Sequence, residues 1–316
     1  MNKTLVEIAG NMSLSQIIEK WQDVVLNPVD DEWLEYPPQK FLDFVHSYPT
    51  TPFDNIPESV HYLKQPTFLV AQAHRLWQTS YRVFNHLREM NAQKFIDFGS
   101  LPFFLPLILR DYFGFKGEII TTTNIVLSKA QKLFLDEKNL KVMKLDLDPY
   151  VSDPAVSSRI ESLPITLDME DGTADFILAS HVVEHLYHPM SLIKESYRLL
   201  KPGGKLMLST DNAMMIDVFA NYIAGYGYTF EPIEQTAAMV FHFWRGHVRF
   251  FTERDLTKLV ESVNFSVEKV EFFHCFYEVF FSDFFKDSIP HIAEWKRDLL
   301  KNTPWLRNDI AVIACR

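Results

Sequence analysis

The segment between residues 175 and 210 constrains the fold of this chain more than any other. Residues 175–179 form an apolar run of strand length. Apolar residues then recur at helical spacing over 191–200, and the sequence Lys-Pro-Gly-Gly at 201–204 predicts the end of that helix. Residues 205–210 have the composition of a second strand. Strand, helix and strand in this order make one βαβ unit, which predicts a parallel sheet.

The same alternation of strands and helices extends over residues 91–316, so we expect one doubly wound α/β domain. Helical insertions above the strand ends are expected at 212–250 and 274–305. Residues 1–90 are expected to form an N-terminal helical extension, with one long helix over 68–90. The other runs with strand character are 94–99, 118–123, 141–148, 265–271 and 309–315.

The composition favours a well-packed protein that acts on small molecules. Hydrophobic residues make up 47% of the 316 residues, which is enough for a large core. The formal net charge of −10 works against binding to a nucleic-acid backbone, so we expect a small-molecule or sugar partner and no nucleic acid. The two cysteines cannot make a disulfide framework, and we find no signal peptide and no membrane span. A cytoplasmic protein is therefore expected, and a homodimer is compatible with the sequence.

A group of ionisable residues follows the apolar run at 175–179. His181, Glu184 and His185 are spaced so that a helix would place them on one face. The carboxyl ends of strands are where open α/β sheets bind their ligands. His247, which is distant in sequence, lies just before another predicted helix. These four side chains are therefore the expected catalytic residues.

Residues 163–212 contain an acidic turn, a strand, the pair Glu184-His185, a helix and the sequence Leu-Lys-Pro-Gly-Gly, in that order. This order resembles the class I S-adenosylmethionine-dependent methyltransferases. The resemblance implies a Rossmann-like, seven-stranded, mostly parallel sheet, with S-adenosylmethionine as cofactor. Residues 208–212 and the aromatic insertion after them also resemble bacterial methyltransferases linked to polysaccharide biosynthesis. Methyl transfer to an oxygen of a sugar or another small acceptor is thus implied, with the N-terminal extension either as a lid or as a packing element.

The resemblance also implies which residues bind the cofactor. The loop after the first strand keeps Asp97 and Gly99, but residues 101–104 stand where the family has further glycines. Asn124 occupies the position of an acidic residue that commonly binds the ribose hydroxyls, and Asp146, or the acid two residues on, matches the position that meets the adenine amino group. The full expected set is Asp97, Phe98, Gly99, Ser100, Asn124, Asp146, Leu147, Asp148 and Ser180.

Three interpretations of the histidine cluster remain open. A neutral His181 or His247 would act as general base for an acceptor hydroxyl, because imidazole titrates near neutral pH. Alternatively, His181, Glu184, His185 and His247 would bind a divalent metal ion, in an arrangement similar to the small-RNA 2′-O-methyltransferases, which have a glutamate in place of His181. In the third interpretation, Glu184 and His185 only bond to a neighbouring loop.

Two other functions compete with methyl transfer to a small molecule. An RNA 2′-O-methyltransferase is disfavoured by the acidic net charge of −10. A catalytically silent, methyltransferase-like binding protein is favoured by the glycine-poor loop after Gly99 and by the missing acid at Asn124. Calorimetric titration with S-adenosylmethionine distinguishes the two: the absence of detectable binding would favour the silent scaffold over an active enzyme.

Overall fold

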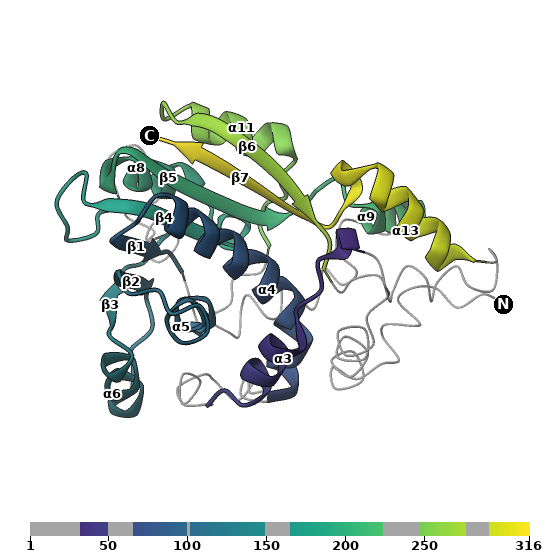
Figure 1. Cartoon of the computed structure of the whole chain (residues 1–316). Helices are drawn as coiled ribbons and strands as arrows, with labels where there is room; N and C mark the ends of the chain where they lie inside the picture. Colours follow the sequence, from purple (N-terminus) through teal and green to yellow (C-terminus); the bar gives the residue numbers. More distant parts are fainter. Residues whose placement is uncertain (1–31, 50–65, 100–101, 149–164, 224–246, 276–290) are drawn as a thin grey trace.

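The structure is a computed structural model of the chain. It describes residues 32–49, 66–99, 102–148, 165–223, 247–275 and 291–316. Figure 1 shows these residues arranged as a twisted sheet with helices packed against it.

A seven-stranded sheet forms the centre of the structure, with the strand order β3-β2-β1-β4-β5-β7-β6. Strands β1 to β5 pair in parallel, whereas β7 runs antiparallel to both β5 and β6. The predicted Rossmann-like, mostly parallel sheet is therefore confirmed. The strands are β1 (Lys94–Asp97), β2 (Glu118–Thr123), β3 (Leu140–Lys144), β4 (Ala174–Ser180), β5 (Leu200–Asp211), β6 (Ser266–Phe273) and β7 (Asp309–Cys315).

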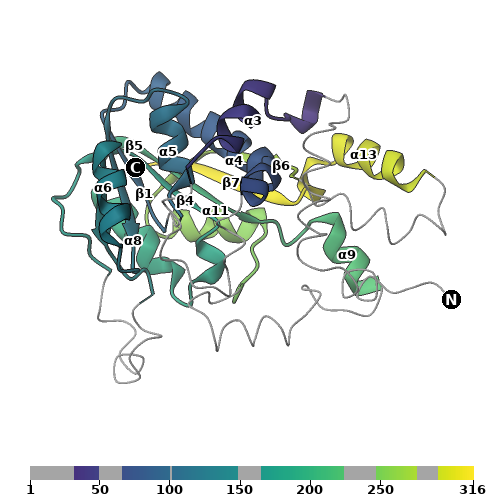
Figure 2. The ribbon, with the colours of Figure 1, turned by 90° about the horizontal axis from the view of Figure 1, so that it is seen from below.

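Helices cover both faces of the sheet (Figures 1 and 2). Along β4, Ile177 is buried in one hydrophobic core and its neighbour Phe176 in another. Adjacent strand residues point to opposite faces, so the two cores lie on opposite sides of the sheet. The doubly wound arrangement is thus confirmed. The helices are α8 (Pro189–Leu199) and α11 (Glu253–Glu261) on the Ile177 face, and α4 (Pro66–Glu89), α5 (Phe104–Asp111) and α6 (Lys129–Glu137) on the Phe176 face.

The N-terminal extension is helical in its described part. The long helix predicted over 68–90 is present as α4, and its residues Val83 and Leu87 are buried against the sheet. Helix α3 (Gln39–His46) packs against α4, with Phe41 completely buried between them and α5. Neither α4 nor any other helix within the described ranges is long and apolar enough to cross a membrane. The domain boundary at residue 90 and the lid role of the extension stay predictions.

Two helices of the predicted insertions lie beyond the ends of β5 and β7 (Figure 1). Helix α9 (Ile216–Ile223) follows β5, and α13 (Ile292–Asn302) leads through η6 (Pro304–Leu306) to β7. The buried Lys296 Nζ lies 3.0 Å from Asp217 Oδ1 and so joins the two helices. Loss of either partner would remove this buried ion pair between the two helices. The remaining parts of both insertions lie outside the described residues.

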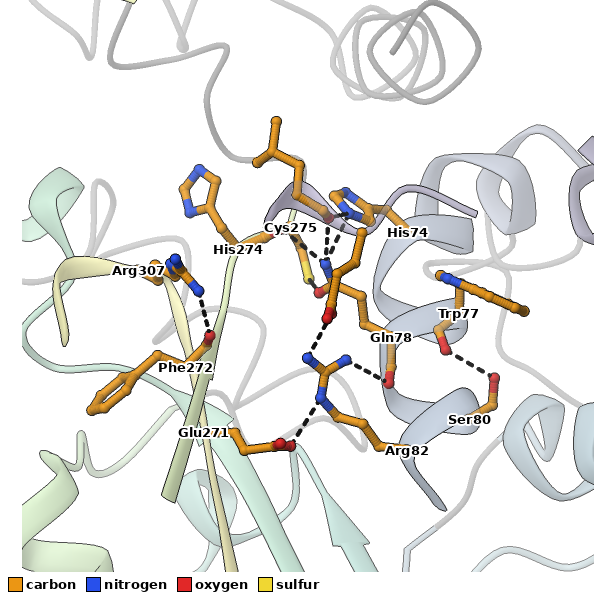
Figure 3. A network of polar contacts seen from close by, with 12 residues as sticks. His74, Trp77, Gln78, Ser80, Arg82, Glu271, Phe272, His274, Cys275 and Arg307 are labelled. Carbon is orange, nitrogen blue, oxygen red and sulfur yellow. Dashed lines mark hydrogen bonds and ion pairs between the residues drawn. The ribbon is translucent and has the colours of Figure 1, made fainter. Parts of the chain in front are cut away.

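A polar network ties α4 to the end of β6 and to the short helix η1 (Glu32–Leu34), as Figure 3 shows. Gln78 lies at its centre: its Nε2 donates to the Leu34 carbonyl at 2.7 Å, and its Oε1 accepts from Cys275 Sγ at 3.3 Å. His74 Nε2 lies 2.6 Å from the same carbonyl. Because these groups are buried, their mutual hydrogen bonds replace those to water and fix the extension against the sheet.

Because of His74, the protein is expected to lose stability as the pH falls below about 6.5. Burial lowers the pKa of His74 from 6.5 to about 4. The unfolded chain therefore takes up the proton first, so the free energy of unfolding falls as the pH drops from about 6.5 to about 4, by about 3 kcal/mol for this residue. The loss is complete below the lower value, where both states are protonated.

The variant His74→Gln keeps a donor toward Leu34 but removes the titration, so we expect a flatter dependence of stability on pH in this window. Denaturant unfolding of both proteins at several acid pH values measures this difference. Equal slopes in the two proteins would contradict the assignment. His291→Gln, at a 79% exposed side chain, is the matched control and should leave the slope unchanged.

Candidate active site

The carboxyl ends of the four parallel strands β1 to β4 carry the predicted cofactor residues. Gly99 has a positive φ of 74°, and a Cβ added there would lie 2.8 Å from Val182 Cγ2 and 3.3 Å from Leu147 Cδ1. The loops after β1, β3 and β4 therefore meet at this glycine. A side chain there would be strained by the backbone conformation and would require Val182 to shift. The one glycine retained in this loop is thus the one that the geometry requires.

The other predicted cofactor residues differ in accessibility. Asp97 and Phe98 are buried, Asn124 is exposed, and Asp146 and Leu147 are half-buried. Asp148 is completely buried and its Oδ2 accepts from the Tyr187 backbone N–H at 2.8 Å. Asp146 is the more accessible of the two acids after β3, and its Oδ1 accepts from the Asp148 backbone N–H at 2.9 Å. The half-buried Ser180 accepts a hydrogen bond from Ser209 at the end of β4, and Ser100 lies outside the described residues.

Residues 181–185 do not form the helix that would place His181, Glu184 and His185 on one face. His181 has a positive φ of 51°, and only Val183–His185 form a single turn of 3-10 helix, η5. The backbone N–H of His181 donates to the carbonyl of Ser209 at 2.9 Å, which continues the pairing of β4 and β5 past the end of β4. Since the chain turns sharply at His181, the His181 and Glu184 side chains meet across the turn and not along a helix.

The ring of His181 lies among three buried carboxylates. Its Nδ1 lies 3.4 Å from Glu184 Oε1 and 3.6 Å from Asp211 Oδ1, and its Nε2 lies 3.3 Å from Asp309 Oδ1. The sequence interpretation missed both aspartates. Asp211 ends β5 and Asp309 begins β7, and the two residues are partners in the antiparallel register. Their only signal in the sequence is an acid at the end of each apolar run.

His247 completes the cluster from a distant part of the chain. Its Nδ1 lies 3.2 Å from Asp211 Oδ2, and its ring meets the ring of His185 edge to face, with 4.8 Å between centroids. The backbone N–H groups of Val248 and Arg249 donate to the carbonyl of Glu184, at 2.9 and 3.2 Å. These two bonds hold the segment at 247–250 against η5. The structure therefore brings together the four residues singled out in the sequence.

The charges of the cluster differ from one residue to the next. Burial and the nearby Arg75 lower the pKa of His181, but its contacts with Asp309 and Glu184 outweigh both and raise it to about 10. Burial raises the pKa of Asp211 to about 6, and burial lowers the pKa of His247. Near neutral pH, His181 is thus an imidazolium, Asp211 is mainly a carboxylate, and His247 is neutral.

Two overlapping groups of side chains are close enough to bind a metal ion: Glu184, His185 and His247, and His181, Glu184 and Asp211. The ligand atoms of each group lie within 4.8 Å of one another. A histidine ligand must offer an unprotonated ring nitrogen. Both ring nitrogens of His181 face carboxylates, which favours the protonated ring. The first group is therefore the better match to a metal site.

Comparison with known proteins finds methyltransferases that are similar to the core of the chain. Residues 116–270 match the profile of a methyltransferase domain. The chain is 31% identical over 138 residues to the mitochondrial ubiquinone biosynthesis O-methyltransferase of Rattus norvegicus. This alignment covers 42% of this chain and 36% of the rat protein. It is also 39% identical over 57 residues to the ubiquinone biosynthesis O-methyltransferase of Xanthomonas oryzae pv. oryzae. That alignment covers 18% of this chain and 24% of the bacterial protein. The chain thus matches about a third or less of the length of these relatives.

A solved S-adenosylmethionine-dependent methyltransferase from Aquifex aeolicus aligns with 74% of this chain and 88% of its own, at 14% identity and a TM-score of 0.41. The matched methyltransferase domain covers β2 to β6 of the sheet described above. The strand order, with its antiparallel β7, is that of a class I methyltransferase.

Proposed function

We propose that this chain, a class I S-adenosylmethionine-dependent methyltransferase, transfers a methyl group to an oxygen of a small acceptor. Membership in the family implies S-adenosylmethionine as methyl donor and a small molecule as acceptor. The observation that carries the oxygen assignment is the pair of His247 and Asp211, because an alcohol must lose a proton as it attacks a methyl group. A sugar is the acceptor class that we favour.

The residues at the strand ends fit the donor. Bound S-adenosylmethionine supplies an electrophilic methyl group on a sulfonium sulfur. Gly99 lets the backbone after β1 approach it closely, as a Cβ there would clash with Val182. The exposed Asn124 after β2 can accept and donate one hydrogen bond each with the ribose hydroxyls, and the half-buried Asp146 can accept from the adenine amino group. Asp97 would brace the loop from within.

His247 is the base that the geometry supports. Its Nδ1 proton donates to Asp211, which leaves the lone pair on Nε2 for a proton from the acceptor hydroxyl. Asp211 also stabilises the imidazolium that results. His181 cannot take this role near neutral pH, because carboxylates at both of its nitrogens keep its ring protonated. Of the two histidines named as bases from the sequence, we therefore retain His247.

A metal-assisted reaction is the second candidate. The grouping of Glu184, His185 and His247 within 4.8 Å favours it. A divalent ion there would lower the pKa of the acceptor hydroxyl directly, so that water could take its proton without a protein base. In that case His247 would be a ligand and its Nδ1 contact with Asp211 would orient the ring.

Incubation of the full chain with S-adenosylmethionine and a panel of sugars, phenols and amines tests the proposal. We expect S-adenosylhomocysteine to form with a hydroxyl acceptor, and activity to survive a chelator. Loss of activity that Zn²⁺ or Mg²⁺ restores would favour the metal candidate. Turnover of amines alone would contradict oxygen transfer, and calorimetry that detects no S-adenosylmethionine binding would favour the silent scaffold.

A further inference from the structure

The carboxylate of Glu184 is buried beside two histidine rings. Its side chain is 1% exposed, and neither of its oxygens accepts a hydrogen bond from the described residues. His181 Nδ1 lies 3.4 Å from Glu184 Oε1, and His185 Nε2 lies 4.0 Å from the same oxygen. A buried carboxylate without full hydrogen bonding is costly to the folded state. A metal ion shared by Glu184 and imidazole nitrogens would offset that cost.

Backbone contacts bring Glu184 together with His185 and His247. Glu184 and His185 are adjacent in the single 3-10 turn η5. The backbone N–H groups of Val248 and Arg249 both donate to the Glu184 carbonyl, at 2.9 and 3.2 Å. These bonds anchor the segment that begins at His247, whose ring meets that of His185 with 4.8 Å between centroids. The three side chains are therefore held close together by the fold itself.

Two imidazoles and one carboxylate suit Zn²⁺ better than Mg²⁺ or Ca²⁺, which prefer oxygen ligands. The ligand atoms of Glu184, His185 and His247 lie within 4.8 Å of one another, so small side-chain movements bring all three within bonding distance of one ion. The side chains of His185 and His247 are 21% and 22% exposed, which makes them accessible to an ion from solvent. The cluster therefore offers three protein ligands to one Zn²⁺ and leaves the fourth position to water.

Other charges near this group of ligands largely offset one another. His181 and Arg75 oppose a cation here. Asp211 and Asp309 lie 3.6 and 3.3 Å from the ring of His181, and both are buried. The carboxylate of Glu184 is therefore the charge that a bound ion would compensate.

We propose that Zn²⁺ binds reversibly to Glu184, His185 and His247 and thereby inhibits methyl transfer. This inference rests on the function proposed above, in which His247 is the base. A ring that is bonded to Zn²⁺ cannot take the proton of the acceptor hydroxyl, so the ion and the acceptor compete for one side chain. The metal-assisted candidate predicts the opposite effect of the ion on the rate.

Calorimetric titration of the full chain with ZnCl₂, without S-adenosylmethionine or acceptor, tests the site itself. We expect the wild type to bind one equivalent of Zn²⁺ at least roughly 10-fold more tightly than His185→Gln or Glu184→Gln, because each variant lacks one ligand. His291→Gln, at a 79% exposed side chain that pairs locally with Glu294, is the matched control and should bind like the wild type. Equal affinities of the wild type and both ligand variants would overturn the proposal.

Histidine-ring NMR of the wild type locates the ion without an acceptor. Zn²⁺ should shift the ring signals of His185 and His247, which their Gln variants assign, and leave the ring signals of the exposed His291 unchanged. Both rings are expected to respond because they lie 4.8 Å apart within the proposed set of ligands. Zinc binding that leaves the His247 signals unshifted would overturn the proposal, since the base would then remain available.

The rate with and without Zn²⁺, measured with the acceptor from the screen, supplies the functional readout. Saturating Zn²⁺ should lower wild-type turnover by at least roughly 10-fold, because the base is blocked, and a chelator should restore it. The ratio of the two rates in His185→Gln should stay much closer to one, whatever the basal rate of that variant. A higher rate with Zn²⁺ would overturn the inhibition and favour the metal-assisted candidate. Failure of the screen would count against the proposed function alone, because calorimetry and NMR decide the zinc site without an acceptor.

Discussion

His247→Ala is expected to lower turnover by roughly 10²- to 10⁴-fold, the usual contribution of a positioned general base. The affinity for S-adenosylmethionine should stay within a few-fold, because His247 contacts Asp211 at the end of β5 and His185, whereas the proposed donor residues Gly99, Asn124 and Asp146 follow β1, β2 and β3. Single-turnover kinetics and calorimetry measure the two quantities separately. Since burial lowers the pKa of His247, the wild-type rate should be constant at neutral pH and fall only below about 6.5, as the ring becomes protonated.

The exposed His291 offers a matched control for this variant. Its side chain is 79% exposed and pairs only locally with Glu294, so His291→Ala should turn over at the wild-type rate. If His247→Ala were as active as this control, the base would have to be another group. If a chelator abolished the activity of the wild type and Zn²⁺ or Mg²⁺ restored it, His247 would instead be assigned as a metal ligand.

The strand and helix pattern predicted the sheet because both of its faces are buried. Buried parallel strands read as continuous apolar runs, and the runs at 175–179 and 309–315 match β4 and β7 within one residue at each end. The start of β5 was not predictable in the same way. Its first residue, Leu200, pairs with Ala174 across a register shift. The strand then continues through Lys-Pro-Gly-Gly, a sequence that predicts the end of a helix, with Gly203 at a positive φ.

The site was predicted in part, for a reason that its geometry explains. His181, Glu184 and His185 are close in sequence, so their spacing signals a cluster. Asp211 and Asp309 join the cluster only because β7 pairs antiparallel to β5, which places the last residue of one strand opposite the first of the other. No local pattern encodes that contact. The charge of His181 depends on both aspartates, so its role could not be derived from the sequence either.

Gly99→Ala is expected to weaken S-adenosylmethionine binding by at least roughly 10-fold. A side chain at the positive φ of 74° costs about 1–3 kcal/mol, and the new Cβ would lie 2.8 Å from Val182 Cγ2. The loop after β1 must then shift, and with it the backbone that faces the donor. Residues 101–104 contain no second glycine. Calorimetric titration of the variant measures the loss.

Gly114→Ala separates backbone strain from the clash. Gly114 has a similar φ of 71°, but a Cβ there would meet no atom within 4 Å. The Gly114→Ala variant should therefore lower the free energy of unfolding through backbone strain alone and leave S-adenosylmethionine binding unchanged. The double variant Gly99→Ala with Val182→Ala removes the clash and keeps the strain, so it should recover part of the affinity. If Gly99→Ala bound the donor as tightly as Gly114→Ala, the cofactor would not lie against this loop, because a close approach of backbone to ligand is what makes a glycine necessary there.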